Sequence, residues 1–115
     1  GPLAQYQAWL QRQATCDAYV VIADESKRAE AVKLVNALRE AGLGADFPLA
    51  PLRINKQFKA ADQTLARFAF VVGSEFPALT LRNLNSRTEE SIAPNADPIE
   101  LLRTRLDQPD GPLIA

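Results

Sequence analysis

The sequence predicts an α/β domain with three layers, in which a mixed sheet of about five strands lies between helices. Its first half alternates short apolar runs with amphipathic helical patterns, which is typical of parallel strands joined by crossover helices. Two later strand patterns are separated only by a tight link, which indicates one antiparallel pair. The length of 115 residues and the 47% hydrophobic content suit one domain with its own core.

The predicted order is β-α-β-α-β-β-β-α. The elements are a strand at 18–23, a helix that begins after Asp24 or Ser26 and ends near 41, a strand at 45–47, a helix at 54–65, strands at 67–73, 78–84 and 86–92, and a helix that begins at 98.

The strand at 18–23 is apolar throughout, so we expect it to be buried on both faces of the sheet. The next helix has a core stripe at Ala31, Val35 and Leu38, and Gly42 is placed to end it. Prolines then keep the segment after the strand at 45–47 from being helical throughout. The second helix has apolar residues at i, i+4, i+7 and i+11, which predicts a buried stripe. That stripe consists of Ile54, Phe58, Ala61 and Leu65.

The strand at 67–73 is apolar and aromatic, whereas the strand at 78–84 alternates and places Thr80 and Arg82 on one face. The strand at 86–92 is more polar. Asp97 caps the last helix, Pro98 occupies its first turn, and a glutamate follows three residues after the cap.

Three regions are expected along the chain. Residues 1–15 form a lead-in, with helical spacing at 3–14, residues 16–108 form the domain, and residues 109–115 form a tail. Gly1 and Pro2 are typical of the scar of a cleaved expression tag, so we expect a piece of a longer protein. The sequence lacks an apolar run of membrane-spanning length and the layout of a signal peptide.

The residue types argue against catalysis. The chain has no histidine and one cysteine, Cys16, which we interpret as a small core or edge residue. Neither a zinc site nor a glycine-rich phosphate loop is present. Glu89 and Glu90 are adjacent on a strand and therefore point to opposite faces. We expect no catalytic and no metal-binding residues, and no cofactor in this domain.

The net charge is −1, but the charges are unevenly distributed. Residues 53–88 hold six basic and two acidic residues, and the remainder holds seven basic and twelve acidic ones. A local basic region on an acidic body suits a selective contact with a polyanion. A chance excess on solvated faces is the alternative.

Four segments together resemble a known family. Residues 29–42 end in Leu-Arg-x-x-Gly, residues 56–62 are Lys-Gln-Phe-Lys-Ala-Ala-Asp, residues 66–75 end in Gly-x-Glu, and residues 79–84 are Leu-Thr-Leu-Arg-Asn-Leu. In this order they resemble the C-terminal anticodon-binding domain of class II aminoacyl-tRNA synthetases, most of all the histidyl type. Two stretches depart from that pattern: the short link that contains Phe76-Pro77, and the segment after Ile92 with Pro94 and Pro98.

The resemblance implies recognition of tRNA, with the anticodon bases splayed out and read one by one. It implies that Glu75 and Arg82 contact bases. Further RNA-binding candidates lie at the start of the second helix, where amide groups favour phosphate, or near Arg82 in sequence. They are Arg53, Asn55, Lys56, Lys59, Asn83, Asn85 and Arg87. The resemblance also implies a cytoplasmic, homodimeric histidine–tRNA ligase that uses ATP and magnesium in a catalytic domain absent from this chain.

Other interpretations remain open. Glu75 could close a turn, Arg82 could be an exposed charge on an edge strand, and Lys56 and Lys59 could solubilise a helix. Phe76 could stack on a base or pack locally. The whole domain could instead be a regulatory or accessory module that binds RNA or a partner protein, or a small α/β enzyme.

Overall fold

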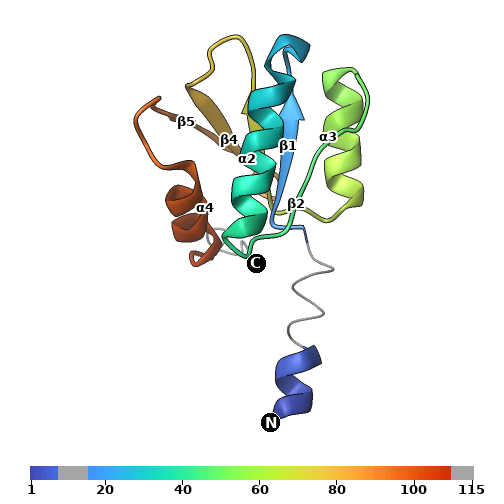
Figure 1. The fold of residues 1–115 in the computed structure, drawn as a ribbon, viewed down its shortest axis with the longest axis vertical. Helices are drawn as coiled ribbons and strands as arrows, with labels where there is room; N and C mark the ends of the chain where they lie inside the picture. Colours follow the sequence, from blue (N-terminus) through green and yellow to red (C-terminus); the bar gives the residue numbers. More distant parts are fainter. Residues whose placement is uncertain (8–15, 110–115) are drawn as a thin grey trace.

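The computed structural model describes residues 1–7 and 16–109 of the chain. Its centre is a five-stranded sheet in the order β2-β1-β3-β4-β5 (Figure 1). The strands are β1 (Ala18–Ile22), β2 (Ala45–Asp46), β3 (Phe68–Val72), β4 (Leu79–Asn83) and β5 (Glu89–Ile92). β2, β1 and β3 are parallel, while β4 is antiparallel to both of its neighbours. The mixed sheet predicted from the sequence is therefore confirmed, but it contains two antiparallel pairs instead of the one expected, because β4 also runs antiparallel to β3.

Helices cover both faces of this sheet. α2 (Arg28–Glu40), which follows a 3₁₀ turn at Glu25–Lys27, and α4 (Pro98–Leu106) pack on one face. α3 (Ile54–Gln63) packs on the other (Figure 1). The three-layer arrangement is thus confirmed, with two helices on one side and one on the other.

The core is divided by the sheet into two apolar clusters. All five residues of β1 are buried, and they alternate between the clusters, as expected for a central parallel strand. Phe68 and Phe70 of β3 pack toward α2 and α4, whereas Ala69 packs toward α3. Among residues 1–7 and 16–109, α3 is the one helix on this side of the sheet, and it packs against β1 and β3 (Figure 1). None of the helices described there packs over that face of β5 or over most of that face of β4.

The predicted helix ends are confirmed except at the start of the first helix, where α2 follows Lys27, which makes no side-chain cap. The carboxylate of Asp97 accepts hydrogen bonds from the backbone N–H groups of Ile99 and Glu100, and Pro98 opens α4. Gly42 follows α2 with a φ of 84°, a left-handed conformation that favours glycine. Asp24 caps the 3₁₀ turn through the N–H of Ser26.

The predicted buried stripe of the second helix is wrong in part. α3 ends at Gln63, Ile54 is 46% exposed, and Leu65 beyond the helix is 83% exposed. Ala61 is buried, but the most buried polar side chain in this part of the chain is Gln57, which the pattern placed outside the stripe. Periodicity missed Gln57 because its burial depends on hydrogen bonds to another element, described below.

Several strands are shorter than predicted. β5 begins at Glu89 instead of residue 86, because the side-chain oxygen of Asn83 accepts from the N–H groups of Asn85 and Ser86 and turns the chain there. Residues 2–7 are helical, while the rest of the predicted lead-in helix and most of the tail lie outside the described residues. The boundaries at 1–15, 16–108 and 109–115 stay predictions. Within the described ranges, none of the helices is long and apolar enough to cross a membrane.

Candidate nucleic-acid interface

The uncovered half of the sheet is the main feature on the α3 side. Cross-strand pairing places Thr80 opposite Val71 and Ser91, and Arg82 opposite Ala69 and Glu89. Paired residues share a face. Val71, Thr80, Arg82, Glu89 and Ser91 therefore form one surface, here called the open sheet face. Each of its members is half-buried or exposed.

Glu75 lies at one end of the open sheet face. It lines a hollow of about 130 Å³ together with Val71, Thr80 and Ser91. A Cβ atom at Gly73 would lie 3.1 Å from the Glu75 carboxylate, so the missing side chain of Gly73 leaves room for the carboxylate to fold back. The Gly-x-Glu spacing thus has a local physical reason, and Glu75 presents a hydrogen-bond acceptor at the rim of the hollow.

Arg82 lies two residues from Thr80 on the same face of β4, which corresponds to roughly 7 Å along the strand. Its guanidinium lies over the ring of Phe58 of α3, 5.1 Å from the ring centroid. Its Nη1 also donates to Glu89, with a separation of 3.0 Å. β4 lies between β3 and β5, so the interpretation of Arg82 as a charge on an edge strand is wrong.

The start of α3 lies at the same edge of the sheet as Glu75, where β1 and β3 end. Arg53, Asn55 and Lys56 are exposed there, and Lys59 follows one turn later. Arg53 is the N-cap and makes no side-chain cap, and the first turn of the helix contains no acidic residue. The helix dipole and the two lysines make this end favourable for an anion.

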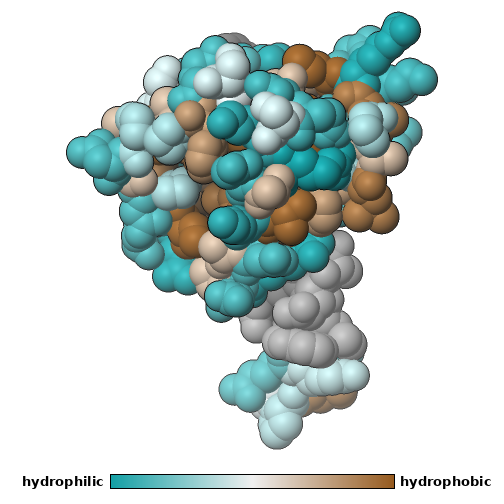
Figure 2. Space-filling model, turned by 45° about the horizontal axis from the view of Figure 1, so that its top comes forward, coloured by the Kyte–Doolittle hydropathy of each residue, from teal (hydrophilic) through white to brown (hydrophobic). Residues whose placement is uncertain are grey.

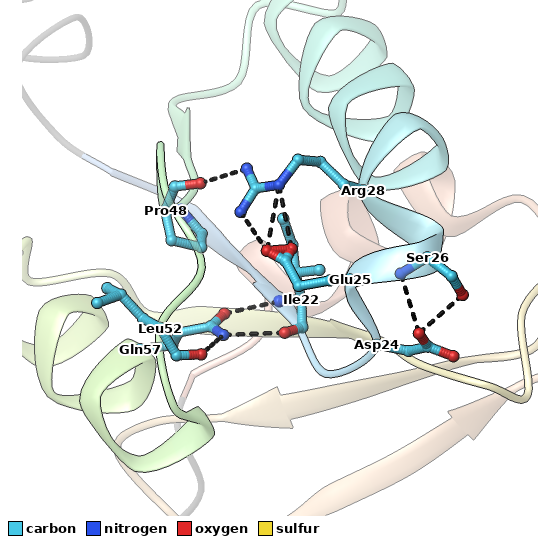
Figure 3. Close-up of polar contacts among 8 residues, drawn as sticks. All are labelled: Ile22, Asp24, Glu25, Ser26, Arg28, Pro48, Leu52 and Gln57. Carbon is cyan, nitrogen blue, oxygen red and sulfur yellow. Dashed lines mark hydrogen bonds and ion pairs between the residues drawn. The ribbon is translucent and has the colours of Figure 1, made fainter.

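Gln57 fixes this end of α3 to the sheet (Figure 3). It is 1% exposed. Its Oε1 accepts from the N–H of Ile22 at 2.7 Å, and its Nε2 donates to the carbonyl oxygens of Ile22 at 2.9 Å and Leu52 at 2.8 Å. β2 pairs with β1 only at Ala18 and Tyr19. The Gln57 amide therefore satisfies the part of β1 that the short β2 does not reach.

The loop between β2 and α3 is held at both ends. Arg28 donates to the carbonyl oxygen of Pro48 at 2.7 Å while it pairs with Glu25, and Gln57 binds the carbonyl of Leu52 (Figure 3). Between these points the loop exposes apolar side chains, and Leu49 is among the most exposed. Figure 2 shows hydrophobic patches on the side of the molecule where α3 lies, within a largely hydrophilic surface.

Asn83, Asn85 and Arg87 lie elsewhere. Asn83 is the last residue of β4, and Asn85 and Arg87 lie in the turn that leads to β5. All three are at the end of the sheet opposite Glu75, as the pairing of Asn83 with Phe68 shows. Asn83 also closes that turn with its side chain. The structure therefore brings Glu75 and the start of α3 to the end of the sheet where β1 and β3 finish. Arg82 lies on the sheet between this end and the opposite one, where Asn83, Asn85 and Arg87 are found.

Three residues at the open sheet face or beneath the start of α3 were not among the sequence candidates. Phe58 was assigned to the core, yet it is half-buried and carries the Arg82 guanidinium. Glu89 pairs with Arg82, while Glu90 pairs with Arg105 of α4 on the other face, so the predicted opposite orientation of the two glutamates is confirmed. The alternation of β4 and β5 could have suggested Glu89, whereas nothing in the local sequence marks Gln57.

Other chemistry is sparse in the described part of the chain. No group of three or more His, Cys, Asp or Glu residues there is placed to hold a metal ion. Cys16 is partly buried and packs against the apolar cluster on the α3 side of the sheet, as predicted. Burial raises the pKa of its thiol, which disfavours the nucleophilic thiolate.

Comparisons with known proteins show which proteins the chain is similar to in sequence and fold. A histidine–tRNA ligase of Opitutus terrae is 39% identical over 79 residues, which make up 66% of this chain and 18% of that protein. The solved histidyl-tRNA synthetase of Nostoc sp. PCC 7120 superposes with a TM-score of 0.72 at 28% identity, over 79% of this chain and 22% of that one. The solved histidyl-tRNA synthetase of S. aureus superposes with a TM-score of 0.69 at 29% sequence identity, over 78% of this chain and 27% of that one.

The chain thus spans about a fifth to a quarter of the length of these relatives. The profile of the family described as "Anticodon binding domain" matches residues 17–102, which include every strand of the sheet and both α2 and α3. This protein therefore belongs to the anticodon-binding domain family.

Proposed function

We propose that this chain recognises the anticodon loop of tRNA, as the C-terminal domain of a histidine–tRNA ligase. Family membership supports the domain type, and the named relatives are histidine–tRNA ligases. The observation that carries the proposal is the open sheet face, a largely uncovered sheet surface in the described part of the chain, with an acceptor at Glu75 and a planar cation at Arg82.

The chemistry of this surface suits unstacked bases. Single-stranded RNA is read through base edges and through stacking on aromatic or guanidinium planes. The Glu75 carboxylate accepts from amino or imino groups of a base, and the Arg82 guanidinium offers N–H donors and a flat face. Arg53, Lys56 and the start of α3 then hold phosphate beside the bases.

The longer protein is part of the same proposal. The names of the relatives support a longer protein that joins histidine to its tRNA. From the resemblance to class II synthetases alone, we further propose that it does so with ATP and magnesium in a separate catalytic domain, as a homodimer in the cytoplasm. This domain supplies recognition and none of the bond-forming residues.

The proposal is tested by NMR titration of the chain with a histidine-tRNA anticodon stem-loop and with the same stem-loop carrying a changed anticodon. We expect the amide resonances of Glu75, Arg82 and residues 53–59 to shift on binding. The shifts at Glu75 and Arg82 should differ between the two anticodons. Glu75→Gln should reduce discrimination between the two RNAs while leaving phosphate binding intact.

The matched control is Glu40→Gln, an exposed carboxylate on α2 on the opposite side of the sheet. It should change neither affinity nor discrimination. Equal shifts with both RNAs would reduce the surface to a phosphate-binding one, and no shifts at about millimolar RNA would contradict recognition by this chain.

A further inference from the structure

A second hollow lies on the other side of the sheet, away from the open sheet face. It encloses about 300 Å³ between the start of α2, the turn before β4 and the loop that leads to α4. Leu79 and Ile92 of the sheet contribute to it, and both belong to the main core cluster. Leu34 and Phe76 are further apolar lining residues, and this hollow is called the α2 pocket below.

The α2 pocket contains one polar anomaly. Glu30 of α2 lines it, and the Oε2 atom of Glu30 is buried without a hydrogen-bond partner among the described residues. A buried carboxylate oxygen normally has a partner, because its desolvation is otherwise uncompensated. Lys33 also lines the pocket, but it is exposed and leaves this oxygen unpaired. The pocket is therefore mainly apolar, and one acceptor at its wall, Oε2 of Glu30, has no donor among the described residues.

Both departures of the sequence from the family pattern meet at this pocket. Phe76 and Pro77 come from the shortened link, and Pro94 and Pro98 come from the altered segment after Ile92. Three prolines restrict the backbone of the walls, which favours a preformed site. A volume of about 300 Å³ is at the lower end for ligand pockets, and it suits one large side chain with its flanking backbone.

We propose that the α2 pocket docks a protein segment that presents a large apolar side chain next to a lysine or arginine. The apolar side chain fills the space above Leu79 and Ile92, and the basic group donates to Glu30 Oε2. The proposal goes beyond anticodon recognition and does not depend on it, since the pocket lies on the α2 side of the sheet.

The test uses three N-acetylated dipeptide amides: Trp-Arg, Trp-Glu and Ala-Arg. Each is titrated into the ¹⁵N-labelled chain. Trp-Arg should shift the amide resonances of Leu34, Phe76 and Ile92 with a Kd in the low millimolar range, and Trp-Glu should bind about tenfold more weakly. Ala-Arg should leave these resonances unchanged, because it lacks the apolar anchor.

Variants then isolate the acceptor. Glu30→Gln should remove the preference for Trp-Arg over Trp-Glu, whereas Glu40→Gln on the same helix should preserve it. Ala96→Trp, at an exposed loop position that lines the pocket, should fill the space and abolish binding of both tryptophan probes.

Several results would overturn the proposal: Trp-Arg shifts confined to other surfaces, equal affinity for Trp-Arg and Trp-Glu, or an unchanged preference in Glu30→Gln. Light scattering gives a further check. A dimer of the chain that Ala96→Trp dissociates would assign the pocket to a second copy instead of a separate protein segment. The RNA titrations test a different surface, so an absence of peptide binding at the α2 pocket would not contradict anticodon recognition.

Discussion

The guanidinium of Arg82 lies over the ring of Phe58, with its central carbon 5.1 Å from the ring centroid. The same guanidinium pairs with Glu89, and its Nε is buried without a hydrogen-bond partner in the described residues. Phe58 therefore holds one face of the cation while Glu89 holds one end. This arrangement joins α3 to the open sheet face, and it orients the cation before any ligand binds.

Arg82→Lys should weaken binding of the anticodon stem-loop by about tenfold at constant salt. Lysine keeps the charge, but it loses the planar group that stacks on Phe58 and offers a flat face to a base. Fluorescence anisotropy with a labelled stem-loop measures the Kd, and circular dichroism verifies that the variant is folded.

Arg39→Lys is the matched control. Arg39 also lies over a phenylalanine ring, that of Phe47, at 6.0 Å, but it belongs to α2 on the other side of the sheet. It should leave the Kd unchanged. If both variants weaken binding equally, or if neither does, the role given to the Arg82–Phe58 pair is wrong.

Gln57→Ala should lower the free energy of unfolding by about 3 kcal/mol. The variant removes three hydrogen bonds and leaves the N–H and C=O of Ile22 without their partner at the end of β1. Urea unfolding followed by circular dichroism gives this value. Gln63→Ala, at an exposed position of the same helix, should stay within about 0.5 kcal/mol of the parent chain.

A Gln57→Ala variant as stable as Gln63→Ala would show that water replaces the side-chain amide at β1. In the folded variant we also expect shifts of the amide resonances of Leu52 and Arg53, because Gln57 holds the Leu52 carbonyl. Weaker phosphate binding at the start of α3 should accompany them.

Most of the fold could be predicted from local patterns. The apolar run of β1, the alternation of β4, the Asp97 cap and the Gly42 terminator each specify structure within a few residues of chain. These signals depend on backbone geometry and on burial of one face, so a single sequence displays them.

The site was harder to predict because its parts depend on long-range packing. Gln57 is buried through bonds to Ile22, 35 residues away, and Phe58 is half-buried beneath the guanidinium of Arg82, which comes from a distant strand. Local periodicity contains neither fact. Asn83, Asn85 and Arg87 were grouped with Arg82 by sequence proximity, but the hairpin turns them to the edge opposite Glu75.

Leu65→Gly should raise the free energy of unfolding by about 0.5–1 kcal/mol. Leu65 follows α3 with a φ of 59°. Its N–H donates to the carbonyl oxygen of Asp62, and the N–H of Ala66 donates to the carbonyl oxygen of Ala61. This is a Schellman motif with leucine where glycine is favoured. The substitution relieves the left-handed strain and removes little packing, since Leu65 is mostly exposed.

The reciprocal change supplies the control. Gly42 occupies the equivalent position after α2, where the N–H of Leu43 donates to the carbonyl of Leu38. Gly42→Ala should destabilise the chain by about 1 kcal/mol. Thermal and urea unfolding of both variants measure the two effects, and a destabilised Leu65→Gly would contradict the assignment of strain to Leu65.

Glu90→Gln should lower the urea midpoint at pH 7, and the difference from the parent chain should shrink as the pH falls below about 4. Arg105 contacts both carboxylate oxygens of Glu90, with separations of 2.6 Å and 3.0 Å, and this hydrogen bonding lowers the pKa of Glu90. Because the pKa is lower in the folded state, the pair stabilises the fold above the unfolded pKa. That stabilisation is lost as pH falls through the folded pKa.

The effect should be modest and sensitive to salt, since the Glu90 and Arg105 side chains are 39% and 32% exposed. Glu100→Gln is the matched comparison, because Glu100 pairs with Arg103 at 3.4 Å on the surface of α4 with both partners more exposed. It should move the midpoint less at pH 7. A Glu90→Gln difference that does not decrease at any acidic pH at which the chain stays folded would exclude the ion pair as its cause, because protonation of Glu90 removes the charge that Arg105 contacts.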